Sequence, residues 1–304
     1  MRDAGRVQMR VRPAAVAGTW YPGTAGALRR EVDTYVSAAV VEPSRDVHAI
    51  IAPHAGLMFA GPVGAYAYKA ATAGTYDVAL LVGPSHFTAF DGVSVWPEGA
   101  FDCPLGPIAI DAGAAAEVLQ SPIAHDLPAA HHREHSLEMQ LPFLRRLLPD
   151  VPIVPMLIGF QRRATIEALA DVLAGAAAGR RALLIASTDL SHHFDATTAA
   201  GLDGRVLAHV ERFDPDGLLA RFESYAEPER GRYVACGGGA AIAVMLAARQ
   251  RGATAGRVLK YAHSGEVSGD CGGVVGYLAA AFGPSSLWGG SAAAGSRLGD
   301  ADTH

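Results

Sequence analysis

Three short apolar runs in this chain each lead into a segment that carries a histidine. The runs cover residues 50–52, 79–82 and 183–186, and the histidines that follow them are His54, His86 and His192, the last preceded by Asp189. Short apolar runs that stop at polar or Gly-Pro segments are typical of buried strands. Because ligands bind outside the carboxyl ends of strands in open α/β sheets, the pattern predicts that these side chains share one site.

The remaining apolar positions alternate between helical spacing and short strand-like runs. Helical spacing predicts helices over residues 65–69, 114–119, 163–178, 202–213, 217–222 and 240–248. Strand-like runs cover residues 93–96, 151–158, 257–261 and 274–278. Pro142 interrupts a leucine repeat, which predicts a late helix start or a kink. The pattern predicts one α/β domain over residues 12–283, between a flexible arm at 1–11 and a disordered tail at 284–304.

Composition and charge indicate which classes of partner and which cellular location to expect. With 304 residues, of which 50% are hydrophobic, the chain can bury a large core. A net charge of -5 gives no electrostatic reason to expect nucleic acid or an anionic membrane as a partner. Cys103, Cys236 and Cys271 form no CxxC pair, so we expect no disulfide framework and a reducing, cytoplasmic location. No apolar run has the length of a membrane span or of a signal-peptide core.

His54, His86 and Cys236 are candidate metal ligands. A single strand-end histidine is commonly an ordinary polar residue, but two in separate loops favour a metal site, and imidazole suits iron, zinc and copper. Cys236 precedes Gly237–Gly239 and a predicted helix, whose N-terminus favours the metal-binding thiolate. The alternative for a free cysteine is a small buried apolar residue, which fits Cys103 and Cys271 better.

Two further polar segments have alternative interpretations. Asp189 and His192 could form an acid/base pair or add ligands, or Asp189 could simply cap a following helix. His131, Glu134 and His135 match the inverted zinc-peptidase motif by letter, which would need both histidines on one helix face.

For the histidine-rich segment we instead expect Glu134, His135 and Glu138 to orient metal ligands. Trp20 and Tyr21 are interpreted as packing anchors. The chain has no G-x-S-x-G nucleophile elbow, Walker loop or dinucleotide fingerprint, which excludes the corresponding enzyme classes.

An ordered set of short motifs resembles a known family. The motifs are an Ala-Gly-x-Trp-Tyr-Pro opening at 17–22, Pro-His-Ala-Gly at 53–56, Gly-Pro-Ser-His at 83–86, Glu-His-Ser-Leu-Glu at 134–138, Pro-Phe-Leu at 142–144, Asp-Leu-Ser-His at 189–192, Cys-Gly at 236–237 and Val-Val-Gly-Tyr at 274–277. Together they resemble the Memo-like family, known in prokaryotes as protein B of the AmmeMemoRadiSam system. The resemblance covers residues 12–283. It implies a fold similar to class III extradiol dioxygenases, with helices flanking a mixed β-sheet.

The resemblance also implies a site. It places metal ligands at His54, His86 and Cys236, with Asp189 and His192 beside them; Cys236 would stand where the dioxygenases have a glutamate. Iron is the expected metal, with copper or zinc as alternatives. The family association further implies protein A and the radical-SAM protein of the same system as partners in a shared modification pathway.

These observations lead to a ranked set of functional hypotheses. The first is iron-dependent redox chemistry on a small molecule or protein side chain, with Asp189, His192 and His135 as catalytic residues. The second is a non-catalytic metal-binding adaptor whose pocket receives a peptide. The third is a zinc-dependent hydrolase.

Overall fold

The centre of the fold is a block of four parallel strands. The computed structural model describes residues 10–288. The four strands are neighbours in the order β2 (Ala49–Ala52), β9 (Ala182–Ser187), β3 (Val78–Pro84) and β8 (Ile153–Ile158). Every residue in them is buried. Near-continuous apolar strands are expected where a parallel sheet is covered on both faces, so these strands could be predicted from their composition.

Antiparallel strands extend the block on both sides into a nine-stranded mixed sheet. Beyond β8 lie β4 (Val93–Val95), antiparallel to it, and then β7 (Ala124–His125). Beyond β2 lies β12 (Val274–Gly283), which pairs antiparallel with β2 and also with β10 (His192–Phe194) and β11 (Ala255–His263). A separate small sheet contains β1 (Val11–Arg12), β5 (Ala100–Phe101) and β6 (Ile108–Ala109).

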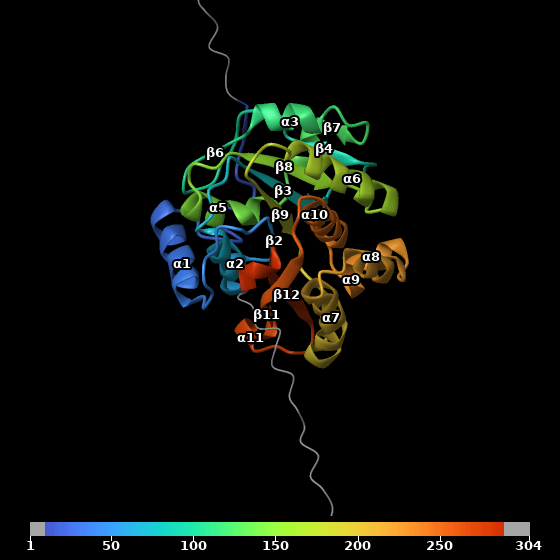
Figure 1. The fold of residues 1–304 in the computed structure, drawn as a ribbon. Helices are drawn as coiled ribbons and strands as arrows, with labels where there is room; N and C mark the ends of the chain where they lie inside the picture. Colours follow the sequence, from blue (N-terminus) through green and yellow to red (C-terminus); the bar gives the residue numbers. More distant parts are fainter. Residues whose placement is uncertain (1–9, 289–304) are drawn as a thin grey trace, which may run out of the picture.

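Helices cover both faces of the large sheet (Figure 1). One layer contains α1 (Ala25–Ala38), α2 (Leu57–Ala71) and α5 (Leu141–Leu147). The other contains α3 (Ala112–Val118), α6 (Arg163–Ala176), α8 (Pro215–Glu223) and α10 (Gly238–Gln250), while α7 (Ala196–Glu211) packs on β11 and β12. The short helices are α4 (Pro128–His131), α9 (Arg230–Tyr233), α11 (Gly265–Ser268), η1 (Glu138–Gln140), η2 (Glu227–Glu229) and η3 (Ser285–Trp288).

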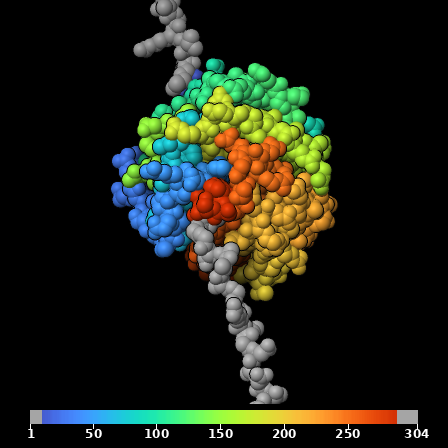
Figure 2. All heavy atoms as spheres, in the orientation of Figure 1, coloured from blue at the N-terminus to red at the C-terminus, as the bar shows by residue number. Residues whose placement is uncertain are grey.

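Elements from the N-terminal and C-terminal parts of the described chain pack against each other. The N-terminal part, blue in Figure 2, lies beside the red C-terminal strand, because β12 pairs with β2 and packs on α2. The elements therefore form a single α/β domain with a mixed sheet between helices, as predicted.

The structure refines several sequence predictions. Pro142 lies in the first turn of α5, so the leucine repeat begins with the 3-10 turn η1 and the helix starts late, as predicted. The strand β10 was not predicted, because its His-His-Phe sequence lacks the apolar alternation of a strand. Arg10 and Val11 were assigned to the flexible arm, but both are ordered parts of the fold. Arg10 forms an ion pair with Asp126, and Val11 is the first residue of β1. Residues 1–9 of that arm and 289–304 of the predicted tail lie outside the described residues.

A helix that crosses a membrane must be both long and apolar. Between residues 10 and 288 no single helix meets both requirements. The pair Glu227–Tyr233 and Gly238–Gln250 passes by length and composition when taken together, across a bend of 80°.

Candidate metal centre

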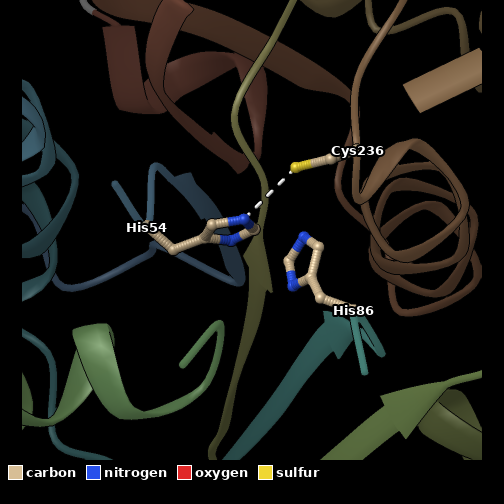
Figure 3. Close-up of side chains that lie close together, drawn as sticks. All are labelled: His54, His86 and Cys236. Atoms are coloured by element: carbon tan, nitrogen blue, oxygen red, sulfur yellow. Dashed lines mark hydrogen bonds between the residues drawn. The ribbon is translucent and has the colours of Figure 1, made fainter. Parts of the chain in front are cut away.

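Three potential ligand atoms converge at the carboxyl ends of the central strands. His54 follows β2, His86 follows β3, and Cys236 lies in the loop before α10 (Figure 3). Their donor atoms all lie within 4.8 Å of one another, and His54 Nε2 is 3.2 Å from Cys236 Sγ. Donors bound to one ion at about 2.0–2.3 Å lie on the order of 3.5 Å apart. The spacing therefore fits a mononuclear site after small side-chain adjustments.

A buried hydrogen-bond network fixes the ring of His54. The hydroxyl of Ser187 donates to the carbonyl of Ser136 at 2.6 Å and accepts from Gln140 Nε2 at 2.8 Å. Its remaining lone pair can only accept, so His54 Nδ1 carries the hydrogen in the 2.9 Å contact with Ser187 Oγ. His54 therefore turns Nε2 towards Cys236 Sγ, and Nε2 is the ring nitrogen that a metal at this point would meet.

A carboxylate fixes the ring of His86. Glu134 accepts from His86 Nδ1 at 2.9 Å and from the His86 backbone N–H at 2.6 Å. Burial acts to raise the pKa of Glu134, but the hydrogen bonds from His86 lower it to about 2. Burial acts to lower the pKa of His86, but hydrogen bonds with Cys236 and Glu134 raise it to about 10. Such a carboxylate partner is the usual arrangement behind a metal-bound histidine, and the structure places Glu134 against a candidate ligand, where it was predicted to act.

Cys236 reaches the centre because the start of α10 packs tightly against the end of β9. A Cβ at Gly237 would lie 2.4 Å from Ser187 O, so only glycine allows this approach. The backbone N–H of Asp189 lies 3.4 Å from Cys236 Sγ. Burial acts to raise the pKa of the thiol, but His54 and His86 lower it to about 6. The side chain is therefore a thiolate at neutral pH, which is the form that binds metals.

Asp189 and His192 border the same cavity as the two histidines. Asp189 Oδ1 accepts the backbone N–H groups of His54 at 2.8 Å and Ala55 at 3.3 Å. Burial raises the pKa of Asp189 and lowers the pKa of His192, so the surroundings favour the uncharged form of each group. Within residues 10–288, His192 Nδ1 has no hydrogen-bond partner.

His135 and Trp20 form another wall of this cavity, which has a volume of about 490 Å³. The ring of His135 stacks on that of His86, with centroids 4.6 Å apart, and lies 4.3 Å from the ring of Trp20. Burial, with His54 and His86 nearby, lowers the pKa of His135 to about 3. His135 is therefore a neutral group between the ligand histidines and an aromatic wall.

Two expectations from the sequence were wrong, and the zinc-peptidase alternative is excluded as well. His131 lies away from the centre, where its Nε2 contacts Ser94 Oγ at 3.0 Å, so the zinc-peptidase letters do not form a ligand set. Glu138 does not orient a metal ligand; it accepts Tyr21 Oη–H at 2.7 Å and backbone N–H groups of the N-terminal segment. Tyr21 is a packing anchor as expected, but Trp20 is 39% exposed and lines the cavity.

Sequence reasoning missed the residues that hold His54 in place. Gln140 bridges Ser187 Oγ, the Pro53 carbonyl and the hydroxyl of Tyr68, and it is buried. A polar amide within a leucine-rich helical pattern was the available signal. Ser187 ends an apolar run and could have been flagged in the same way. Trp20 gave no signal, because its partner His135 is distant in sequence.

Comparisons with known proteins were made over the whole chain. The family model described as Memo-like protein matches residues 12–281. A MEMO1 family protein of Methanosarcina mazei is 35% identical over 274 residues, covering 89% of this chain and 98% of that protein. A MEMO1 family protein of Methanothermobacter thermautotrophicus is 33% identical over 278 residues, covering 88% and 98% respectively.

One solved structure bears on the fold. The crystal structure of the uncharacterized protein JW3007 from Escherichia coli K12 matches with a TM-score of 0.53 and 13% sequence identity. The match covers 76% of this chain and 98% of that chain. At this identity the likeness supports the shared architecture and carries no information about activity.

Proposed function

The chain belongs to the Memo-like protein family, and from that premise we propose that it binds one metal ion through His54, His86 and Cys236. The observation that carries the proposal is the convergence of these three donor atoms within 4.8 Å of one another, from three separate segments of the chain. The two hydrogen-bonded rings support it further, because their Nδ1–H groups are used by Ser187 and Glu134.

Iron is the metal that we propose. Two imidazoles and one thiolate are a donor set that accepts Fe(II), Cu(I) or Zn(II), so copper and zinc are the competing ions. When bound, iron would supply redox chemistry for a small molecule or a protein side chain. The chain itself would supply the position of the ion, because Ser187 and Glu134 hold the two rings.

Asp189 and His192 are proposed to handle protons beside the ion. Burial raises the pKa of Asp189 and lowers the pKa of His192, which shifts each group towards the form in which Asp189 can donate a proton and His192 can accept one. Asp189 Oδ1 is held by two backbone N–H groups, which fixes the carboxyl group at the cavity wall. Substrate entering this cavity would therefore meet a proton acceptor and a proton donor next to the ligands.

His135 is proposed to contact the substrate as a neutral hydrogen-bonding group. It borders the cavity between His86 and Trp20, and its lowered pKa keeps it uncharged at neutral pH. The cavity wall also contains Met58 and Phe59, so it presents an apolar surface to the guest. An apolar wall with a few polar groups is typical of sites for small molecules or single side chains.

We also propose that the reaction belongs to a pathway shared with protein A and the radical-SAM protein of the AmmeMemoRadiSam system. This part rests on the family resemblance alone. Fold and family membership carry no mechanism by themselves.

Metal titration of the metal-free protein under reducing, anaerobic conditions tests the proposal. We expect one equivalent of Fe(II) to bind wild type, and Cys236→Ser, His54→Ala and His86→Ala each to lower the affinity at least about a hundredfold. Asp189→Asn should leave the affinity within about threefold, because Asp189 offers no direct ligand in this proposal.

Two matched variants control for general effects of losing a thiol or an imidazole. Cys271 is an exposed free cysteine and His132 an exposed histidine outside the cavity, so Cys271→Ser and His132→Ala should bind like wild type. Unchanged affinity in both Cys236→Ser and His86→Ala would overturn the metal assignment. Metal binding without any redox turnover of the bound ion would favour the adaptor function instead.

A further inference from the structure

A second cavity lies at the opposite edge of the sheet, where β2, β9 and β3 begin. Its volume is about 490 Å³, and its wall includes His48 before β2, Arg181 before β9 and Tyr76 before β3. These strands are adjacent and parallel, so the residues preceding them are brought to one edge. The ends of α6 and α10 add Arg180 and Arg251. None of these residues takes part in the metal centre.

The wall of this cavity carries an excess of positive charge. Four arginines line it, and two of them are neutralised: Arg180 by Glu117 at 2.5 Å and Arg181 by Asp77 at 2.7 Å. Arg45 and Arg251 form no ion pair with a carboxylate among residues 10–288. Against these two cations stands Asp46, the one carboxylate among the lining residues.

The guanidinium of Arg251 is fixed in place without losing its charge. It donates to the backbone carbonyls of Ala177 and Arg180 at the end of α6, so it is held rigidly beside the cavity. His48 lies on the same wall, and burial together with the Arg251 cation lowers its pKa. Arg251 Nε and His48 Nδ1 are buried and have no hydrogen-bond partner within the described chain.

We propose that this cavity binds the phosphate group of a small phosphorylated molecule. Arginine is the residue that suits phosphate oxygens best, because its planar head offers several donors. Arg45 is exposed at the rim and free to close on an anion, while Arg251 provides a fixed charge at the wall. Val47 and Tyr76 border the same space and would contact the organic part of the ligand. A pocket of this size admits a small molecule and not a polymer.

Calorimetric titration of the full chain with inorganic phosphate and with glycerol 2-phosphate tests this site. We expect saturable binding of both at low ionic strength, weakening as salt is added. Tighter binding of glycerol 2-phosphate than of inorganic phosphate would assign the site to a phosphorylated small molecule. Equal affinity for the two would contradict the proposed contact with the organic part of the ligand. Arg45→Ala should weaken binding about threefold to fivefold and Arg45→Glu about tenfold or more.

Arg45 is exposed, so its variants should keep the wild-type fold, which circular dichroism and thermal unfolding will verify. Arg205→Ala is the matched control, because Arg205 is an exposed arginine of α7 outside this cavity. His54→Ala should bind phosphate like wild type, which separates this site from the metal centre. Absence of saturable phosphate binding, or equal binding by the Arg45→Glu and Arg205→Ala proteins, would overturn the proposal and leave a hydrated cavity.

Discussion

Two buried polar clusters lie near each other in this fold, and they differ in how their charged and hydrogen-bonding groups are paired. In the first, which we call the Arg12–Glu138 cluster, Arg12 donates to Glu138 and to the carbonyls of His131 and Glu134. Glu138 also accepts from Tyr21 and from two backbone N–H groups. In the metal centre, the network uses the outer nitrogens of His54 and His86 and leaves donor atoms facing Cys236.

The difference separates a structural cluster from a candidate site. Arg12 and Glu138 are each at most 1% exposed, more deeply buried than His86, whose side chain is 28% exposed. Depth of burial therefore does not mark function here. The informative property is whether the buried groups pair off with each other, as Arg12 and Glu138 do, or turn several potential ligand atoms towards one point.

Removing the carboxylate of Glu138 should have the largest effect. Glu138→Ala leaves the Arg12 cation buried without its partner, which costs about 3–5 kcal/mol of unfolding free energy. Urea unfolding followed by circular dichroism measures this. A loss below about 1 kcal/mol would mean that the cluster is not a structural anchor, since such a loss is typical of an exposed pair.

The two clusters can be compared directly through one cysteine each. Cys103 is close enough to Glu138 to feel its charge, and burial raises its pKa to about 11, whereas the pKa of Cys236 is lowered to about 6. The thiolate is the reactive form and is populated above the pKa. In metal-free protein at pH 7, iodoacetamide should therefore modify Cys236 at least about a hundredfold faster than Cys103.

Mass spectrometry of the labelled peptides over a pH series checks this. The rate at Cys236 should rise as the pH increases through about 6 and stay low below it. A Cys271→Ser background removes the exposed thiol from the comparison. A rate at Cys236 that rises only in the range of an ordinary thiol would contradict the proposed influence of His54 and His86.

Weakening the support of His86 should have an intermediate effect. Glu134→Gln keeps the shape of the side chain but removes the charge that accepts His86 Nδ1–H. Loss of such a partner typically lowers metal affinity about tenfold to a hundredfold. Iron titration of the metal-free variant measures the change. An affinity equal to that of wild type would show that His86 needs no charged partner.

Removing the hydroxyl that holds His54 should have the smallest effect. Ser187→Ala deletes the neutral hydrogen bonds of one hydroxyl to His54 Nδ1, to Gln140 and to the Ser136 carbonyl, while the ligand nitrogen itself stays. Of these, one holds His54 directly. A neutral hydrogen bond contributes about 1 kcal/mol, so iron affinity should fall roughly threefold to tenfold. The same titration tests this, and a drop as large as that of His54→Ala would show that Ser187 does more than orient the ring.

The sequence predicted the residues of the candidate centre that directly follow the central strands. His54, His86 and Asp189 each follow a central apolar run, and parallel strands must present such residues at one edge. The position of Cys236 in that edge depends on how α10 packs against β9, which no periodicity in the sequence encodes. Only the family resemblance placed Cys236 beside His54 and His86.

The errors have a common physical cause. Glu138 occurs in the same short segment as Glu134 and His135, and spacing along the chain suggested that all three would orient metal ligands. The segment instead turns between α4 and η1. His131 therefore contacts Ser94 of β4 and Phe101 of the small sheet, while Glu138 binds the N-terminal segment. The contacts of Glu138 join residues more than a hundred positions apart in the sequence, as its hydrogen bond with Tyr21 illustrates, and local sequence patterns do not encode them.

The position of β9 has a consequence for the order in which the protein matures during synthesis. β2 and β3 leave the ribosome first, yet they are not neighbours in the sheet, because β9 lies between them. His54 and His86 can therefore reach their final separation only after residues 182–187 have emerged and inserted, and Cys236 emerges later still. A nascent chain that has not yet reached Cys236 contains the two histidines but not the third proposed ligand. Acquisition of the metal should consequently be a late event, coupled to closure of the sheet by its last-made central strand.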